Sequence, residues 1–334
     1  GKLIAFVSNR SDNPDANSNT DIWIVSADNE DKGQTLIQVT QNEGSDNNPS
    51  WSPDGKWLTY TTVTEPDLIW YATNKLAMAS ADGKEVKVLS EDLDRNVYNP
   101  MFAADGKSIY FVLEDSGEQH LGRYQLDSKK IDRPISGAFS LGAFSFSPDG
   151  KTLASLISKP HLPEEVFVGV GAEPKQITFT NETLLKSIKW AELENVQFAS
   201  KDGTQIEGFF YKPPAFQPNF KYPTLLRIHG GPVSQYDLGF NQEAQLLAAQ
   251  GYLVIMVNPR GSSGYGQDFS RAIWADWGNK DFEDVVAGVD HAIAKGYADP
   301  ERLGVGGWAY GGILTNYVIT QTYRFKGAIS GARE

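Results

Sequence analysis

The stretch that decides the fold is Gly307-Trp308-Ala309-Tyr310-Gly311-Gly312. Its glycines have the spacing of a nucleophile elbow, the sharp strand-to-helix turn Gly-x-Ser-x-Gly, where small residues let backbones pass closely. Residues 303–306 before it predict a short buried strand, and residues 312–320 after it predict a helix with an apolar stripe. The middle position is alanine, whose methyl group cannot attack a carbonyl carbon. The sequence therefore predicts an elbow that lacks its nucleophile.

The segments upstream of the elbow alternate between strand-like and helical patterns. Residues 224–228 and 252–257 predict strands, and residues 243–250 and 282–293 predict helices. Such alternation is typical of a parallel sheet covered by helices. Together with the elbow it predicts an α/β-hydrolase domain over residues 196–334, with only the N-terminal half of that fold visible.

The strand at 224–228 leads into His229-Gly230-Gly231-Pro232. Glycines at this point let backbone N–H groups turn toward a bound oxygen, which suits an oxyanion hole completed by the N–H of Tyr310, the residue after the nucleophile position. A simple glycine turn is the alternative interpretation. His229 is expected to fix the loop by hydrogen bonding rather than to act as a base.

The first part of the chain, residues 1–195, repeats one phrase. It occurs at residues 48–56, 99–107 and 145–151, and each copy ends in Asp-Gly-Lys followed by a strand-like run. Asp-Gly between two strands is a strong hairpin signal, and the spacing of about 45 to 50 residues suits four-stranded propeller blades. We predict about four β-propeller blades here, the first of them partial. From the repeats alone, a free-standing propeller that binds partners is equally consistent with the pattern.

Composition excludes several classes of function. The 334 residues suffice for two domains, and the net charge of -12 without a basic stretch argues against nucleic acid and against an anionic membrane as partners. The absence of cysteine excludes disulfides and thiolate metal sites but leaves cytoplasm and periplasm both open. The sequence begins and stops inside strand-like segments, so we expect residues to be missing at both ends.

The ordered set of motifs resembles the prolyl oligopeptidase family of serine peptidases, in its acylaminoacyl-peptidase and dipeptidyl-peptidase-like branch. The motifs are the Trp-Ser-Pro-Asp-Gly-Lys repeats, His229-Gly230-Gly231-Pro232, residues 258–266 (Asn-Pro-Arg-Gly-Ser-Ser-Gly-Tyr-Gly) and the elbow. The resemblance implies a propeller over an α/β-hydrolase domain, and short peptides as substrates. It implies Ala309 at the nucleophile position, an oxyanion hole from the N–H groups of Gly231 and Tyr310, and a substrate-binding wall of Trp308, Tyr310, His229 and Gly230. It implies no metal or other cofactor.

Two departures from the family pattern bear on activity. An alanine inside an otherwise intact elbow favours a single inactivating substitution over natural decay, because decay erodes neighbouring glycines as well. The family's triad follows the order Ser, Asp, His, yet all four histidines precede position 309 and the only later acid is the terminal Glu334. The chain as written therefore lacks the nucleophile and the downstream Asp and His. The histidines are His120, His161, His229 and His291.

The sequence thus predicts a serine exopeptidase or oligopeptidase that works by acyl transfer and is inactivated here at its nucleophile. A peptide- or protein-binding pseudoenzyme and an esterase on the same scaffold stay open as alternatives. The acidic pair Glu164-Glu165 has two interpretations, a contact for a peptide amine and a solvated charge pair before a strand. Homo-oligomers formed through propeller edges also stay open.

Overall fold

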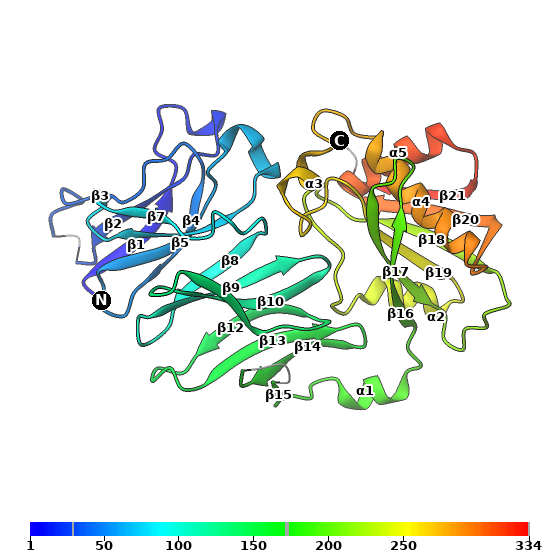
Figure 1. Cartoon of the computed structure of the whole chain (residues 1–334), viewed down its shortest axis with the longest axis horizontal. Coiled ribbons are helices and arrows are strands. Elements are labelled where there is room, and N and C mark those ends of the chain that lie inside the picture. Colours follow the sequence, from blue (N-terminus) through cyan, green and yellow to red (C-terminus); the bar gives the residue numbers. More distant parts are fainter. Residues whose placement is uncertain (29, 171–173, 333–334) are drawn as a thin grey trace. The chain divides into compact units, whose positions relative to one another are not determined.

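In the computed structural model, which describes residues 1–28, 30–170 and 174–332, the chain forms two compact units (Figure 1). The first unit comprises residues 1–157 and 164–178, and the second comprises residues 158–163 and 179–334. The domain boundary predicted after residue 195 falls inside strand β16 (Glu192–Ala199), which lies wholly in the second unit. No helix among the described residues is long and apolar enough to span a membrane.

Sheets of mainly antiparallel strands build the first unit. One sheet has the order β1-β2-β3, a second has the order β4-β5-β6-β7, and a third has the order β15-β14-β13-β12-β10-β9-β8 with β11 beside β10. Two short 3-10 helices, Pro14–Ala16 and Pro66–Tyr71, lie in its connections. The strands are β1 (Leu3–Ser8), β2 (Asp21–Ser26), β3 (Ile37–Gln38), β4 (Asp46–Trp51), β5 (Trp57–Thr62), β6 (Lys75–Ser80), β7 (Val86–Val88), β8 (Val97–Phe102), β9 (Ser108–Asp115), β10 (Glu118–Gln125), β11 (Lys130–Ile135), β12 (Ser140–Phe146), β13 (Leu153–Lys159), β14 (Leu162–Val168) and β15 (Lys175–Gln176).

The repeated Asp-Gly pairs form hairpin turns, as the sequence predicts. In the turn between β4 and β5, Ser52 Oγ and the Lys56 N–H donate to the Asp54 carboxylate at 2.7 and 3.0 Å. Gly55 lies there at a φ of +68°, a region open to glycine at no steric cost. The third sheet runs continuously through a single parallel bridge between β10 and β12, so the number of blades stays a prediction.

A mixed sheet with the order β16-β17-β19-β18-β20-β21 forms the second unit. Its first three strands pair antiparallel, and β19, β18, β20 and β21 pair parallel, which confirms the predicted parallel region. The helices α2, α4 and α5 pack on this sheet (Figure 1). The further elements are β17 (Gln205–Lys212), β18 (Tyr222–Ile228), β19 (Leu253–Asn258), β20 (Ala298–Trp308), β21 (Phe325–Gly331), α1 (Glu182–Ser187), α2 (Gln242–Ala249), α3 (Gln267–Arg271), α4 (Lys280–Ala294) and α5 (Tyr310–Gln321).

Apolar residues on both faces of the central strands explain why this sheet is covered. Strand β19 is buried at every position, as expected for a parallel strand between two helical layers. Helix α4 buries residues at positions 281, 284, 285, 288, 289 and 292, the spacing of one helical face. Two of those positions are aspartates, and their partners belong to the candidate site.

Candidate active site

The elbow has the backbone of a nucleophile turn. Ala309 connects β20 to α5 with φ 53° and ψ -124°, a conformation that is sterically unfavourable for a residue with a Cβ. Strain of this kind persists only where the surrounding structure over-determines it. It is the geometry that lifts the side chain of the central residue out of the turn.

Close backbone contacts leave no room for a side chain at the elbow glycines. A Cβ at Gly307 would lie 2.4 Å from the Gly311 carbonyl oxygen, and a Cβ at Gly311 would lie 2.2 Å from the Ile228 carbonyl oxygen. No real Cβ approaches backbone that closely, so neither position accepts a larger residue without a backbone shift. The same holds for the third glycine, because a Cβ at Gly312 would lie 2.4 Å from the Gly331 carbonyl oxygen.

Strand β21 holds the elbow from the other side. The Ala309 N–H donates to the Gly331 carbonyl at 3.0 Å, and Ser330 Oγ donates to the Gly312 carbonyl at 2.8 Å. The Trp308 ring covers the Cα of Gly331, where a Cβ would lie 2.3 Å from a ring carbon. The strained residue therefore lies between fixed neighbours on both sides.

The glycine loop after β18 lies directly against the elbow. A Cβ at Gly230 would be 3.4 Å from the Trp308 carbonyl oxygen and 3.7 Å from Ala309 Cβ. Gly231 has φ +125°, outside the range of residues with side chains. Tyr310 begins α5, so its N–H belongs to the first turn of a helix, where the dipole favours negative charge. The structure thus brings residues 229–231 and 308–310 together.

His229 is buried and fixes the loop. Its Nδ1 lies 2.6 Å from the Gly230 carbonyl oxygen and its Nε2 lies 2.9 Å from Ser262 Oγ. Burial lowers the pKa of His229 to about 4, so the ring is neutral at neutral pH. These contacts agree with a loop-fixing role.

The two aromatic residues of the elbow lie differently. The Tyr310 side chain is buried, donates from its hydroxyl to Asp281 Oδ2 at 2.5 Å, and packs edge-on against Trp277. The Trp308 side chain is 68% exposed. Trp308 can therefore face a ligand with its side chain, whereas Tyr310 offers its backbone.

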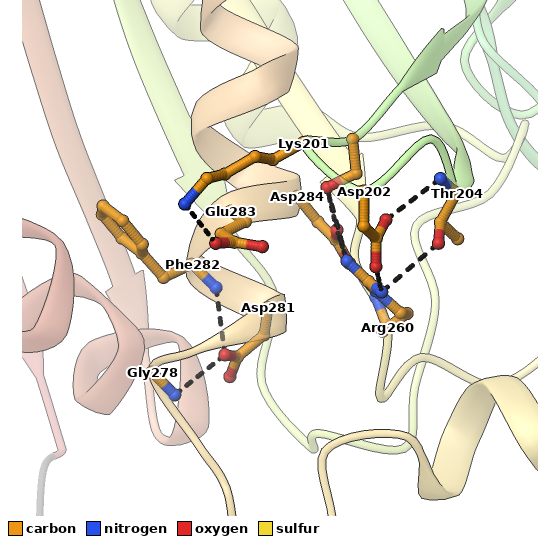
Figure 2. Close-up of polar contacts among 10 residues, drawn as sticks. Lys201, Asp202, Thr204, Arg260, Gly278, Asp281, Phe282, Glu283 and Asp284 are labelled. Carbon is orange, nitrogen blue, oxygen red and sulfur yellow. Dashed lines mark hydrogen bonds and ion pairs between the residues drawn. The ribbon is translucent and has the colours of Figure 1, made fainter.

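Two buried aspartates of α4 support the loops around the elbow, and the sequence motifs did not single them out (Figure 2). Asp281 accepts from the N–H groups of Gly278 and Phe282 at 2.8 and 3.0 Å, besides the Tyr310 hydroxyl. Burial raises the pKa of Asp281, against the effect of these hydrogen bonds. A carboxylate on the core-facing positions of an amphipathic helix was the available signal.

Asp284 is fully buried and pairs with Arg260, which lies in the loop after β19 (Figure 2). The guanidinium donates to both carboxylate oxygens at 3.0 and 2.7 Å, and the Arg260 N–H donates at 2.8 Å. Ser200 Oγ donates to the same carboxylate at 2.6 Å. Burial lowers the pKa of Arg260, but the hydrogen bonds from Asp284 and Asp202 outweigh it and hold that pKa above its usual value. This pair joins the loop after β19 to the β16–β17 hairpin and α4.

The remaining predicted candidates have structural partners. His161 Nε2 lies 2.8 Å from the Ala191 carbonyl oxygen, His291 stacks on Phe198, and His120 Nε2 lies 3.0 Å from the Gly137 carbonyl oxygen. Glu165 is buried and accepts from Thr178 Oγ1 at 2.5 Å. Within the described ranges, no group of three or more His, Cys, Asp or Glu side chains is placed to hold a metal.

Comparison with known proteins identifies the family. The sequence profile described as "Prolyl oligopeptidase family" matches residues 238–333, which include the elbow and the Arg260 loop. Residues 238–333 belong to this family. The similarity of the chain to proteins named as peptidases extends beyond that segment.

Two curated relatives show how far the resemblance reaches. "Uncharacterized peptidase YuxL" of Bacillus subtilis is 37% identical over 69% of this chain and 35% of its own length. "Dipeptidyl-peptidase 5" of Porphyromonas gingivalis is 30% identical over 93% of this chain and 46% of its own length. The chain therefore spans about half or less of the length of these relatives.

Solved structures of peptidases match the fold. The Pyrococcus horikoshii acylaminoacyl peptidase superposes with a TM-score of 0.84 at 27% identity over 99% of this chain and 51% of its own. Dipeptidyl peptidase 4 of Porphyromonas gingivalis, at 18% identity and a TM-score of 0.74, supports the fold alone. These structural neighbours combine a propeller with an α/β-hydrolase domain, and the chain shares the fold of about half of such a protein.

Proposed function

We propose that this chain is part of a serine peptidase of the prolyl oligopeptidase family whose nucleophile position is occupied by Ala309. The observation that carries the proposal is the backbone of Ala309, at φ 53° and ψ -124° between glycines that admit no Cβ. An alanine gains nothing from this strain, whereas a nucleophilic serine needs it to present its hydroxyl.

The mechanism assigned to the active parent is acyl transfer. A serine at position 309 attacks the carbonyl carbon while a base takes its proton, and the tetrahedral oxyanion accepts hydrogen bonds from the N–H groups of Gly231 and Tyr310. Collapse of the tetrahedral intermediate breaks the scissile C–N bond, and the amine leaves with the proton that the base had taken. Water then hydrolyses the acyl-enzyme, which releases the acid and restores the serine hydroxyl. The close approach of Gly230 to Ala309 supports this assignment, because it puts the glycine loop beside the reacting atoms. Short peptides are the proposed substrates, with the exposed Trp308 on the wall of the site.

A rival serine and histidine pair exists in the second unit. Ser262 Oγ lies 2.9 Å from His229 Nε2. Ser262 has no exposed surface, and the lowered pKa of His229 makes that ring a weak base. The pair therefore holds the loop, and an experiment has to separate it from position 309.

The test is labelling of the full-length gene product by a serine-reactive phosphonate, with the adduct located by mass spectrometry. We expect no adduct while Ala309 is present and one adduct, at position 309, in the Ala309→Ser variant. Adding Ser262→Ala to Ala309→Ser should leave that adduct unchanged. An adduct on Ser262, or none in the Ala309→Ser protein, contradicts the proposed nucleophile position.

The alanine itself favours a second function for the chain as written, which is binding without hydrolysis. Removing the nucleophile of a serine peptidase lowers turnover by about 10⁶ and leaves the binding pocket in place. If the phosphonate does not react in either form but labelled short peptides bind, the peptide-binding pseudoenzyme replaces the peptidase. Comparing hydrolysis of peptide amides and simple esters by the Ala309→Ser variant separates a peptidase from an esterase.

A further inference from the structure

Asp46, the first residue of β4, is fully buried in the first unit. Neither of its carboxylate oxygens has a hydrogen-bond partner among the residues that the structure describes. Its backbone N–H donates to the Thr20 carbonyl at 2.7 Å, so the residue is held in regular structure. Buried polar atoms are nearly always partnered, and an ionised carboxylate without a donor is strongly unfavourable. This carboxylate therefore needs either a cation beside it or a proton on it.

The surroundings of Asp46 are mainly oxygens, together with the Asn42 amide, which donates to the carbonyl oxygens of Gly44 and Val63 at 3.2 and 3.3 Å. Asp21 is also buried, accepts from Gln38 Nε2 at 3.1 Å and Thr40 Oγ1 at 3.2 Å, and acts on Asp46 through its negative charge. The hydroxyls of Thr40 and Thr62 adjoin the Asp46 carboxylate without forming a hydrogen bond of normal geometry. No Lys, Arg or His in the described part of the chain forms an ion pair with either aspartate. Two negative charges thus adjoin one another without a counter-charge.

The next repeat has different residues at the positions equivalent to Asp46 and its neighbours. Matching backbone bonds define the equivalence, because the Ile22 N–H donates to Thr40 Oγ1 where the Leu76 N–H donates to Ser90 Oγ. The Asp46 N–H donates to Thr20 where the Val97 N–H donates to Asn74. The equivalent pairs are Asp21 and Lys75, Thr40 and Ser90, Asp46 and Val97, and Thr62 and Leu113.

The fold therefore does not need a carboxylate at this place. In the second repeat, Val97 is buried opposite Leu113 with no polar atom to satisfy, and Lys75 forms an ion pair with Glu91. The first repeat has acquired two carboxylates and a second hydroxyl at these positions. Such a concentration of acidic and neutral oxygens, buried and without a positive counter-charge from the described residues, is the ligand chemistry of a hard cation.

We propose that Asp46 and Asp21, together with the hydroxyls of Thr40 and Thr62, bind a divalent cation of the calcium type in the first unit. The two carboxylates balance the charge of a divalent ion, and the hydroxyl oxygens are ligands that Ca²⁺ accepts, with water completing the coordination. The inference concerns the repeats and is independent of peptide hydrolysis. Its failure would leave the proposed peptidase assignment untouched.

The experiment uses Ca²⁺ and its luminescent analogue Tb³⁺ on the full-length protein at neutral pH. Tyr60 is buried near the pair, since the charges of Asp46 and Asp21 add to the effect of burial in raising the pKa of its hydroxyl. Its ring is therefore placed to sensitise Tb³⁺ emission. We expect saturable emission that Ca²⁺ displaces, and a melting temperature that rises with CaCl₂ and falls with chelator.

Variants assign the signal to the pair. Asp46→Val copies the residue of the next repeat, and Asp46→Asn keeps the shape if the valine variant does not fold. Either change should weaken Tb³⁺ binding at least tenfold and abolish the calcium effect on the melting temperature. Glu43→Gln, at an exposed carboxylate three positions away, should change neither.

Two results overturn the proposal. One is Tb³⁺ binding of equal strength in the parent protein and the Asp46 variants, which would place the ion elsewhere. The other is a folded parent protein that shows neither emission nor a calcium effect. In that case no metal ion compensates Asp46, and burial, which raises its pKa to about 6, makes a proton the neutralising partner only in more acidic solution.

Discussion

Asp284 in the second unit and Asp46 in the first unit are both buried completely, yet their surroundings are opposite. The Asp284 carboxylate accepts from Arg260 and Ser200, and a guanidinium balances its charge. The Asp46 carboxylate has no hydrogen-bond partner of normal geometry among the described residues, and the charge that acts on it is that of another aspartate, Asp21. The difference shows that burial of a charge is stable only with a partner, whether that partner belongs to the chain or comes from solution.

A third buried group in the same molecule avoids the problem by losing its charge. His229 has the ring contacts of a neutral imidazole, and burial keeps it unprotonated at neutral pH. Pairing, neutralisation and an unsatisfied carboxylate are therefore all present in one chain. Variants can convert one situation into another and measure the free energy of each.

Arg260→Ala removes the positive charge beside Asp284, so that this carboxylate, like that of Asp46, is buried without a counter-charge. The carboxylate would stay buried with Ser200 as its remaining side-chain donor, so we expect the free energy of unfolding of the second unit to fall by about 3 to 5 kcal/mol. Urea unfolding followed by tryptophan fluorescence measures it. Lys201→Ala removes an ion pair to Glu283 from a lysine that is 78% exposed, and as a control it should cost less than about 1 kcal/mol. Equal losses in the two variants would contradict the comparison.

Acid should destabilise the second unit through His229. Its native pKa is about 4 and its ordinary value is about 6.5, so between these values the unfolded chain binds a proton that the native state does not. Stability is full above pH 6.5 and is lost as pH falls toward 4, by up to about 3 kcal/mol. Urea unfolding across this range should show a shallower decline for His229→Gln than for the parent protein. Parallel curves would mean that the histidine is not buried neutral.

Tyr310→Phe removes one of three donors to Asp281. The carboxylate keeps the N–H groups of Gly278 and Phe282 as donors. Its hydrogen bonding is therefore intermediate between that of Asp284, which is fully partnered, and that of Asp46. We expect a loss of about 1 to 2 kcal/mol in the free energy of unfolding. Tyr317→Phe, at a tyrosine that is 41% exposed on the same helix, should change stability by about 0.5 kcal/mol or less. A larger loss for Tyr317→Phe would refute the assignment.

Ala309→Gly should raise the free energy of unfolding, because glycine adopts the positive φ at this position without steric strain. Backbone strain differs here from a buried charge, which only a binding partner or a proton can stabilise. Glycine relieves strain of about 1 to 3 kcal/mol and loses about 0.5 to 1 kcal/mol through the entropy of the unfolded chain, which leaves a net gain of about 1 kcal/mol. Ala287→Gly, inside α4, should instead cost about 1 kcal/mol. Calorimetry on both variants tests the sign, and a destabilised Ala309→Gly protein would remove the evidence for strain.

The elbow was predictable because its information is local. Glycine spacing, a strand before it and a helix after it all lie within residues 303–320, and the structure has β20 ending at Trp308 and α5 beginning at Tyr310. The Asp-Gly hairpins were predictable for the same reason. The sequence also predicted the loop-fixing role of His229, whose partner Gly230 is its neighbour.

The buried aspartates were not predicted, because their partners are distant in sequence. Arg260 and Asp284 are 24 residues apart. Asp21 and Asp46 lie on strands of two different sheets, which a hydrogen bond from the Asp46 N–H to the Thr20 carbonyl connects. The repeated phrase was recognised from its turn residues. The equivalence of Asp46 and Val97 becomes visible only when the strands on either side of that turn are aligned through their hydrogen bonds. The sequence also left the number of blades open. A single bridge joins β10 to β12 and so connects strands that the repeat spacing assigns to separate blades.

The contacts between β21 and the elbow bear on the order of folding. During synthesis the chain emerges from its N-terminus, so residues 307–312 are available before residues 330–331. The hydrogen bonds from Ala309 to Gly331 and from Ser330 to Gly312 cannot form until that later strand has docked. A strained φ persists only when its surroundings over-determine it. The elbow should therefore acquire its final backbone geometry only after β21 has docked, and slow docking of β21 would delay it.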